Sequence, residues 1–126
     1  MGHLMHPTGP RHARRICVAL ATLAALLLPA PAQAERDEVA NWPATCAEAV
    51  ARLTFELPAE ERRRLAAMPE QNLPLLHHGY GTHIRNSFGL WLGNIALARD
   101  CTGAALPHPD EASMAIIRAL WLSLQP

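Results

Sequence analysis

Apolar side chains near the carboxyl end of the chain recur every three or four residues, which is the spacing of an amphipathic helix. The stripe consists of Met114, Ile117, Leu120, Trp121 and Leu124. Pro109 suits the first position of a helix, and Asp110 and Glu111 place negative charge where the helix dipole favours it. The pattern therefore predicts a final helix that begins at Pro109 and buries one face.

A second helix is predicted to begin after Thr45. Thr45 precedes Glu48 by three residues, which is the spacing of a capping box. The apolar positions that follow on one side are Val50, Leu53 and Leu57. We expect this helix to run to about residue 56.

Prolines mark the next boundaries. Pro58 ends the helix before it or starts the next one, which we expect at about 59–68 with two glutamates in its first turn. Pro69 and Pro74 bracket a turn.

The segment from Leu75 to Asn94, LLHHGYGTHIRNSFGLWLGN, differs from the rest of the chain in its glycines and histidines. Large apolar residues still recur in it at steps of four, four, three and four, which fits a helix and not a strand. These residues are Tyr80, Ile84, Phe88, Trp91 and Ile95. We therefore expect residues 80–95 to be helical, with the aromatic side facing inward and with Gly89 and Gly93 on a common face.

An alternative interpretation divides this segment in two. Gly93 would end one helix, and Asn94 would cap a short helix that runs through Asp100 and stops at Gly103. No run of residues alternates strongly enough to predict a strand. Under both interpretations the expected fold is all-α, a small bundle of four to five short helices.

The first 34 residues have the three parts of a secretory signal peptide. Residues 11–15 carry three arginines, residues 16–28 form an apolar run interrupted only by Thr22, and residues 32–34 are the small-residue cleavage sequence AQA. The apolar run is shorter than the roughly 20 residues needed to cross a membrane. We therefore expect cleavage, a periplasmic or secreted protein and no stable membrane span afterwards; a retained anchor is the alternative.

Cleavage would leave 126 − 34 = 92 residues, enough for one small domain. We divide the chain into a signal peptide (1–34), a flexible arm (35–44) and a helical domain (45–126). Of the 11 basic residues three lie in the leader, so 8 arginines would face 11 acidic residues, a formal charge of −3. The basic triplet at 62–64 follows two glutamates, which favours a solvated helix face over a nucleic-acid contact.

Two cysteines, Cys46 and Cys101, would remain after cleavage. An even pair in a small exported domain predicts a disulfide. Closing a loop of about 55 residues would stabilise the fold by about 4 kcal/mol on the chain-entropy estimate. A reactive thiol is the alternative, but neither cysteine has a C-x-x-C partner.

The four histidines outside the leader, His77, His78, His83 and His108, raise the possibility of a metal site. Zinc ligands on a helix are usually spaced by four residues on one face. The offsets from His83 to the other two in its segment are five and six, with a G-x-G break between them. The spacing therefore does not select a metal, and no cofactor is expected.

A hydrolase active site is the second possibility. Ser87, Ser113, His83, His108 and Asp110 supply the residue types of a Ser-His-Asp arrangement. Neither serine lies in a G-x-S-x-G elbow, so no sequence motif supports either of them as a catalytic nucleophile.

A structural polar network is the third interpretation. Arg85 has five donors and Asp110 two acceptor oxygens, so a bidentate pair would join the central segment to the start of the last helix. Asn86 would satisfy backbone groups at a break in the helix.

Two motifs, H-x-G-x-G-x-x-I-R-N-x-[FW]-G-L-W at His77–Trp91 and H-P-D-[DE]-x-S at His108–Ser113, resemble a bacterial domain family of unknown function. The resemblance covers about residues 58–124. Phe88 stands where family members often have Trp, and His78 where they usually have another residue, which argues against a general metal role for the His77–His78 pair. The family implies no activity.

These observations favour a binding or interaction module for an unknown protein or small-molecule ligand, with no nucleic-acid partner. The expected contact surface is residues 79–86 together with residues 108–111. The candidate binding residues are His77, His83, Arg85, Asn86, Trp91, His108, Asp110 and Ser113. The rival is a small periplasmic hydrolase that uses His83, Asp110 and Ser113, or His77 and His108.

Overall fold

The computed structural model describes residues 36, 39 and 41–126, and the predicted signal peptide and cleavage sequence lie outside them. The elements in chain order are α2 (Cys46–Glu56), α3 (Ala59–Ala67), the 3-10 helix η2 (Glu70–Leu76), α4 (Tyr80–Ser87), the 3-10 helix η3 (Leu90–Leu92), α5 (Ile95–Thr102) and α6 (Pro109–Ser123). The described residues contain no strand, so the predicted all-α class is confirmed.

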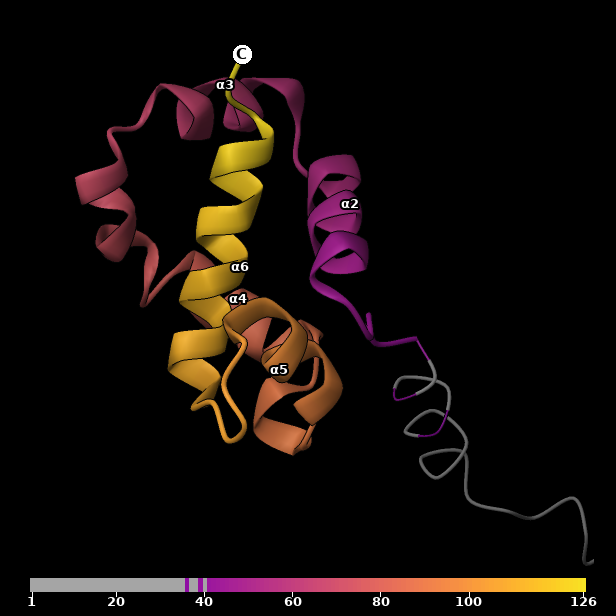
Figure 1. Cartoon of the computed structure of the whole chain (residues 1–126). Helices are drawn as coiled ribbons and strands as arrows, with labels where there is room; N and C mark the ends of the chain where they lie inside the picture. Colours follow the sequence, from indigo (N-terminus) through magenta and orange to yellow (C-terminus); the bar gives the residue numbers. More distant parts are fainter. Residues whose placement is uncertain (1–35, 37–38, 40) are drawn as a thin grey trace, which may run out of the picture. The chain divides into compact units, whose positions relative to one another are not determined.

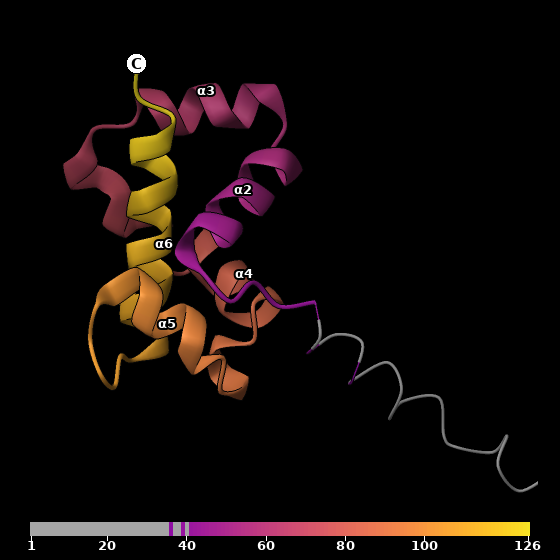
Figure 2. The same cartoon turned by 45° about the vertical axis from the view of Figure 1, so that its right-hand side comes forward.

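Helix α6 is the central element of the domain (Figures 1 and 2). Helix α2 and η2 flank it, α3 lies near its carboxyl end, and α4 and α5 lie beside its amino-terminal half. Its first turn begins at Pro109, as predicted, and its side chains at Ile116, Ile117 and Leu120 are fully buried. The predicted stripe is confirmed at Ile117 and Leu120, while its other members, Met114, Trp121 and Leu124, are partly buried at the rim of the core; Ile116 was not part of the prediction.

Helix α6 supplies four side chains to the core, and each of the other described elements supplies one or two. It comprises Ala49, Leu53, Leu65, Leu73, Ile84, Phe88, Leu90, Leu97, Ala98, Ala112, Ile116, Ile117 and Leu120. Burying a large apolar side chain contributes about 1.5–3 kcal/mol, so helices this short are stabilised mainly by packing on α6.

Helix α2 begins as the sequence predicts. The Thr45 side chain accepts a hydrogen bond from the Glu48 backbone N–H, and the Glu48 carboxylate accepts from the Thr45 N–H, which completes the capping box. The predicted helix at 59–68 is also present, ending one residue earlier. The turn expected between Pro69 and Pro74 is part of η2, in which Pro74 lies inside the helix.

The single helix expected over residues 80–95 is wrong. The chain leaves α4 at Phe88 because Gly89 adopts a left-handed conformation with φ 67°, and Gly93 does the same at φ 93°. Ile95 is consequently 41% exposed instead of facing the core. The two glycines lie at either end of η3 and do not share a helix face.

The alternative interpretation of this segment is confirmed. Asn94 caps α5 by accepting a hydrogen bond from the Leu97 N–H, and Gly103 ends α5 with φ 71°. The Asn94 amide also donates to the carbonyl oxygens of Pro43 and Phe88. One side chain therefore holds both sides of the helix break.

Residues 42 and 43, within the range expected to be a flexible arm, pack against the domain. Pro43 is buried and bound by the Asn94 amide at 2.9 Å. The Trp42 ring lies so close to the Gly89 backbone that a Cβ at residue 89 would overlap it. Gly89 is thus required both for its left-handed conformation and for the indole that covers it.

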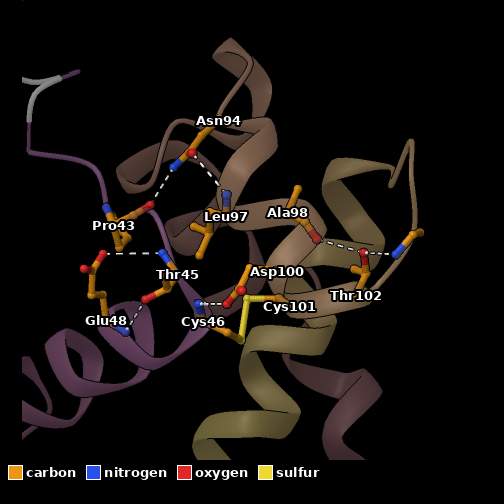
Figure 3. The surroundings of a disulfide bond; sticks show 11 residues. Pro43, Thr45, Cys46, Glu48, Asn94, Leu97, Ala98, Asp100, Cys101 and Thr102 are labelled. Atoms are coloured by element: carbon orange, nitrogen blue, oxygen red, sulfur yellow. Dashed lines mark hydrogen bonds between the residues drawn. A yellow bond between two sulfur atoms is a disulfide. The ribbon is translucent and has the colours of Figure 1, made fainter.

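The predicted disulfide joins Cys46 at the start of α2 to Cys101 near the end of α5 (Figure 3). The two Cα atoms are 4.9 Å apart, within the usual range for a disulfide. The Asp100 carboxylate accepts a hydrogen bond from the Cys46 N–H at 2.7 Å beside the bridge. This carboxylate satisfies one of the unpaired N–H groups at the amino end of α2.

Among the described helices, none combines the length and the apolar character that a membrane crossing requires.

Candidate functional site

The two sequence motifs meet where α4 packs against the first turns of α6. Helix α4 supplies Arg85, and α6 supplies Asp110 and Ser113. His77 follows η2, and Trp91 lies in η3. Residues that are distant in the sequence are thereby brought into one cluster.

Arg85 is the buried centre of this cluster, with only 5% of its surface exposed. Its NH1 donates to the Ser113 hydroxyl at 2.8 Å, and its NH2 donates to the His77 carbonyl at 3.2 Å and to the Thr82 hydroxyl at 3.0 Å. Gly81 leaves room for the guanidinium, since a Cβ there would lie 3.0 Å from NH1. The planar group therefore connects three segments of backbone.

The predicted proximity of Arg85 and Asp110 is confirmed, but the bidentate geometry is wrong. Arg85 Nε lies 3.3 Å from Asp110 Oδ1 as an ion pair, and its N–H is not aligned well enough to form a hydrogen bond. The other two guanidinium nitrogens point to Ser113, His77 and Thr82. A helix start at Pro109 leaves the Asp110 carboxylate partly exposed, at the edge of the guanidinium.

Two imidazoles flank the Asp110 carboxylate. His77 Nε2 is 3.9 Å from Oδ1, and His108 Nδ1 is 3.5 Å from Oδ2. The same His108 Nδ1 accepts a hydrogen bond from the Asp110 backbone N–H at 3.1 Å and thereby caps α6, while Glu111 completes a capping box. An Nδ1 that accepts carries no proton, so neutral His108 has its hydrogen on Nε2.

Trp91 forms the exposed part of the cluster. Its side chain is 53% exposed, although the sequence pattern predicted that it would face the core. The His108 ring meets it edge-on with the ring centres 5.7 Å apart, and the Arg85 guanidinium carbon lies 5.9 Å from the ring centroid. Two neighbours therefore hold the indole, which still presents much of its surface to solvent.

Two of the predicted site residues, His83 and Asn86, do not contribute as expected. His83 is exposed and lies 3.4 Å from the Ser87 hydroxyl, and no contact of the described residues joins it to Asp110 or Ser113. Asn86 is exposed, and the break after α4 is satisfied by Asn94 instead. The predicted network therefore holds for Arg85 and is wrong for Asn86.

Ser113 lacks the surroundings of a nucleophile. It is fully buried, accepts from Arg85 NH1 and donates to the Asp110 carbonyl at 2.9 Å. Its hydroxyl is thus used in the start of α6, and the set His83, Asp110 and Ser113 is not assembled.

Tyr80, at the start of α4, is a separate perturbed group. Burial, with a smaller contribution from the negative charge of Glu56, raises the pKa of Tyr80 to about 12. Its hydroxyl is buried with no hydrogen-bond partner among the described residues.

Thr82 and Gly81 belong to the site, although the sequence did not single them out. Thr82 lies three residues before Arg85, one helical turn away, which is the spacing that could have indicated the contact. Within residues 41–126, no group of three His, Cys, Asp or Glu side chains is arranged to hold a metal ion.

The described residues form a small all-α domain, in which a buried arginine, Arg85, lies behind an exposed tryptophan, Trp91. The chain belongs to the family described as Domain of unknown function (DUF6794), whose family model matches residues 42–124. The match starts at Trp42, the indole that packs on Gly89, and therefore includes the packed segment before α2. No curated protein and no solved structure matches the chain.

Proposed function

We propose that this protein is an exported binding module whose contact surface is the face formed by Trp91, His77, His108 and Asp110. The observation that carries the proposal is Trp91, a large ring that is 53% exposed yet held by two neighbours. Tryptophan is among the residues that contribute most to binding energy at interfaces. A ring that is already oriented loses little conformational freedom when a partner covers it.

The buried part of the cluster supports a binding role for this face. Arg85 is fixed by three hydrogen bonds to Ser113, His77 and Thr82, and it fixes in turn the position of Asp110. The exposed groups are thus attached to rigid elements. A surface that is already ordered binds a partner more tightly than one that must become ordered on binding.

The rival hydrolase has weaker support. Its first residue set is dispersed, because His83 lies beside Ser87 and Ser113 is buried. Its second set, His77 and His108, flanks Asp110, but the Thr82 and Ser113 hydroxyls beside Arg85 each accept from the guanidinium and donate to a backbone carbonyl. A nucleophile within reach of an imidazole is the element that this proposal lacks.

Export is the part of the proposal that rests on the leader-like sequence of residues 1–34. A disulfide between Cys46 and Cys101 supports it, because such bonds persist mainly in oxidising compartments. A nucleic-acid partner is not proposed: Arg63 and Arg64 pair with glutamates of their own helix, and Arg62 donates to the carbonyls of Thr54 and Leu57.

The test is capture of partners by the immobilised protein from a periplasmic fraction, quantified for wild type, Trp91→Ala and His83→Ala. His83 is the matched control, because it is exposed on the same helix as Arg85 but lies outside the cluster. We expect Trp91→Ala to lose at least about tenfold in captured partner and His83→Ala to lose none. Equal capture by all three proteins would refute the proposal, and turnover of a substrate that His108→Ala abolishes would favour the hydrolase.

A further inference from the structure

We infer that the face around Trp91 takes a neutral, hydroxyl-rich ligand, namely a sugar ring of an uncharged oligosaccharide. This inference rests on the proposed binding role and names the chemical class of the ligand. Three properties of the face lead to it: its balanced charge, its hydrogen-bonding groups and its flat aromatic surface.

The charges of the cluster are already balanced within the protein. The Arg85 guanidinium lies 3.3 Å from the Asp110 carboxylate, and its carbon lies 5.9 Å from the Trp91 centroid. A ligand cation on Trp91 would meet the positive charge of Arg85, and a ligand anion would meet Asp110. Glu111, also in the first turn of α6, accepts from the His108 backbone N–H, and the helix dipole offsets its charge there. The Arg85 and Asp110 charges offset each other on this face, so a charged ligand meets no net opposite charge there.

The exposed polar groups offer both donors and acceptors. Asp110 Oδ2 has His108 Nδ1 as its close neighbour at 3.5 Å, and that nitrogen is occupied by the Asp110 backbone N–H. Oδ2 thus keeps its capacity to accept, and the side chain is 40% exposed. Neutral His108, which is 57% exposed, carries its proton on Nε2 and can donate. Hydroxyl groups, which donate and accept at once, match this combination.

The Trp91 ring supplies the apolar surface. Sugar rings have one face of C–H groups and a perimeter of hydroxyls, so they can lie on an indole while their hydroxyls reach polar neighbours at its edge. His108 meets the edge of Trp91 at 5.7 Å between ring centres and adjoins Asp110, which puts the donor and the acceptor beside the indole. A purely apolar ligand would leave these two groups without partners.

The experiment compares neutral, cationic and anionic oligosaccharides. Acetylated chito-oligosaccharides and cello-oligosaccharides are neutral, deacetylated chitosan oligosaccharides are cationic, and oligogalacturonates are anionic. Each is titrated into isotopically labelled protein purified with its disulfide intact, and indole and imidazole NMR shifts are followed. The variants are Trp91→Ala and, as the matched control, Phe55→Ala, which removes an exposed aromatic ring from α2.

We expect saturable shifts of Trp91 and His108 with at least one neutral oligosaccharide, and about tenfold weaker binding of the charged ones. Trp91→Ala should lose at least about tenfold in affinity, and Phe55→Ala should bind like wild type. The inference is overturned if neither neutral oligosaccharide gives saturable shifts, if a charged one binds most tightly, or if both variants lose equally. Capture of a protein partner that depends on Trp91, without any response to neutral sugars, would sink this inference and leave the proposed function standing.

Discussion

Replacement of Arg85 by alanine is predicted to destabilise the domain strongly. The change removes hydrogen bonds to Ser113, His77 and Thr82 and the ion pair with Asp110. The bond to Ser113 is buried, and a hydrogen bond to a charged group contributes about 1.5–3 kcal/mol. The other acceptors lie nearer the surface and regain water, so their loss costs less. We expect about 3 kcal/mol in total.

Thermal unfolding followed by circular dichroism measures this loss. For a domain of this size 1 kcal/mol corresponds to about 4–8 °C, so the melting temperature should fall by about 12–24 °C. Arg85→Lys should lose most of the same stability, because one ammonium group cannot span the acceptors that the guanidinium reaches. Asn86→Ala is the control, since this neighbour is exposed and should change stability by less than about 0.5 kcal/mol.

Two results would refute this reasoning. A melting temperature for Arg85→Ala within a few degrees of the Asn86→Ala value would mean that Arg85 does not hold α4 to α6. A wild-type melt for Arg85→Lys would mean that the positive charge matters and the fork of donors does not.

Three further predictions concern the disulfide, the helix break and the buried tyrosine. Cys46 and Cys101 should show no free thiol in protein purified without reductant, and replacing both by serine should cost about 4 kcal/mol in urea unfolding; free thiols at these two positions would contradict the bridge. Gly89→Ala should cost at least about 2 kcal/mol more than Gly93→Ala, because both have positive φ but only residue 89 lies under an indole; equal urea midpoints would contradict this packing. Tyr80, the only tyrosine, should ionise near 12 in the folded protein against 10.0 when unfolded, as read by absorbance. Folding stability should therefore hold below about pH 10 and fall as the pH rises towards 12; a native midpoint at 10 would show that Tyr80 is solvated.

Local rules in the sequence located the helix starts well. Thr45 forms a capping box with Glu48, and Pro109, Asp110 and Glu111 occupy the first turn of α6, so both helix starts depend on residues within one turn of each other. The disulfide was also predictable, because only two cysteines lie outside the predicted signal peptide. These features depend on few residues and on little of the tertiary structure.

The helix break at Gly89 could not be decided from spacing alone. Phe88 and Leu90 are both buried, so the apolar pattern continues across a change of chain direction. What decides the break is the Trp42 ring on Gly89, a contact between residues 47 positions apart that no periodicity encodes.

The site was predicted in part for a similar reason. The residue types suggested an Arg85–Asp110 pair, and the structure has it. The sharing of the guanidinium among Ser113, His77 and Thr82 depends on how α4 lies against α6, and the exposure of Trp91 follows from the break that was not foreseen. His108 as a helix cap was missed because histidine is an uncommon residue at that position.

Because of the bond between Cys46 and Cys101, the effect of a proteolytic cut depends on where in the domain the cut falls. A single cut anywhere inside the closed ring, from α2 to α5, leaves one covalent molecule whose pieces stay tethered until a reductant is added. A cut in the 103–108 connection instead frees α6, and with it Asp110 and Ser113. The position of the first cleavage therefore decides whether the cut protein can refold from tethered pieces or loses α6.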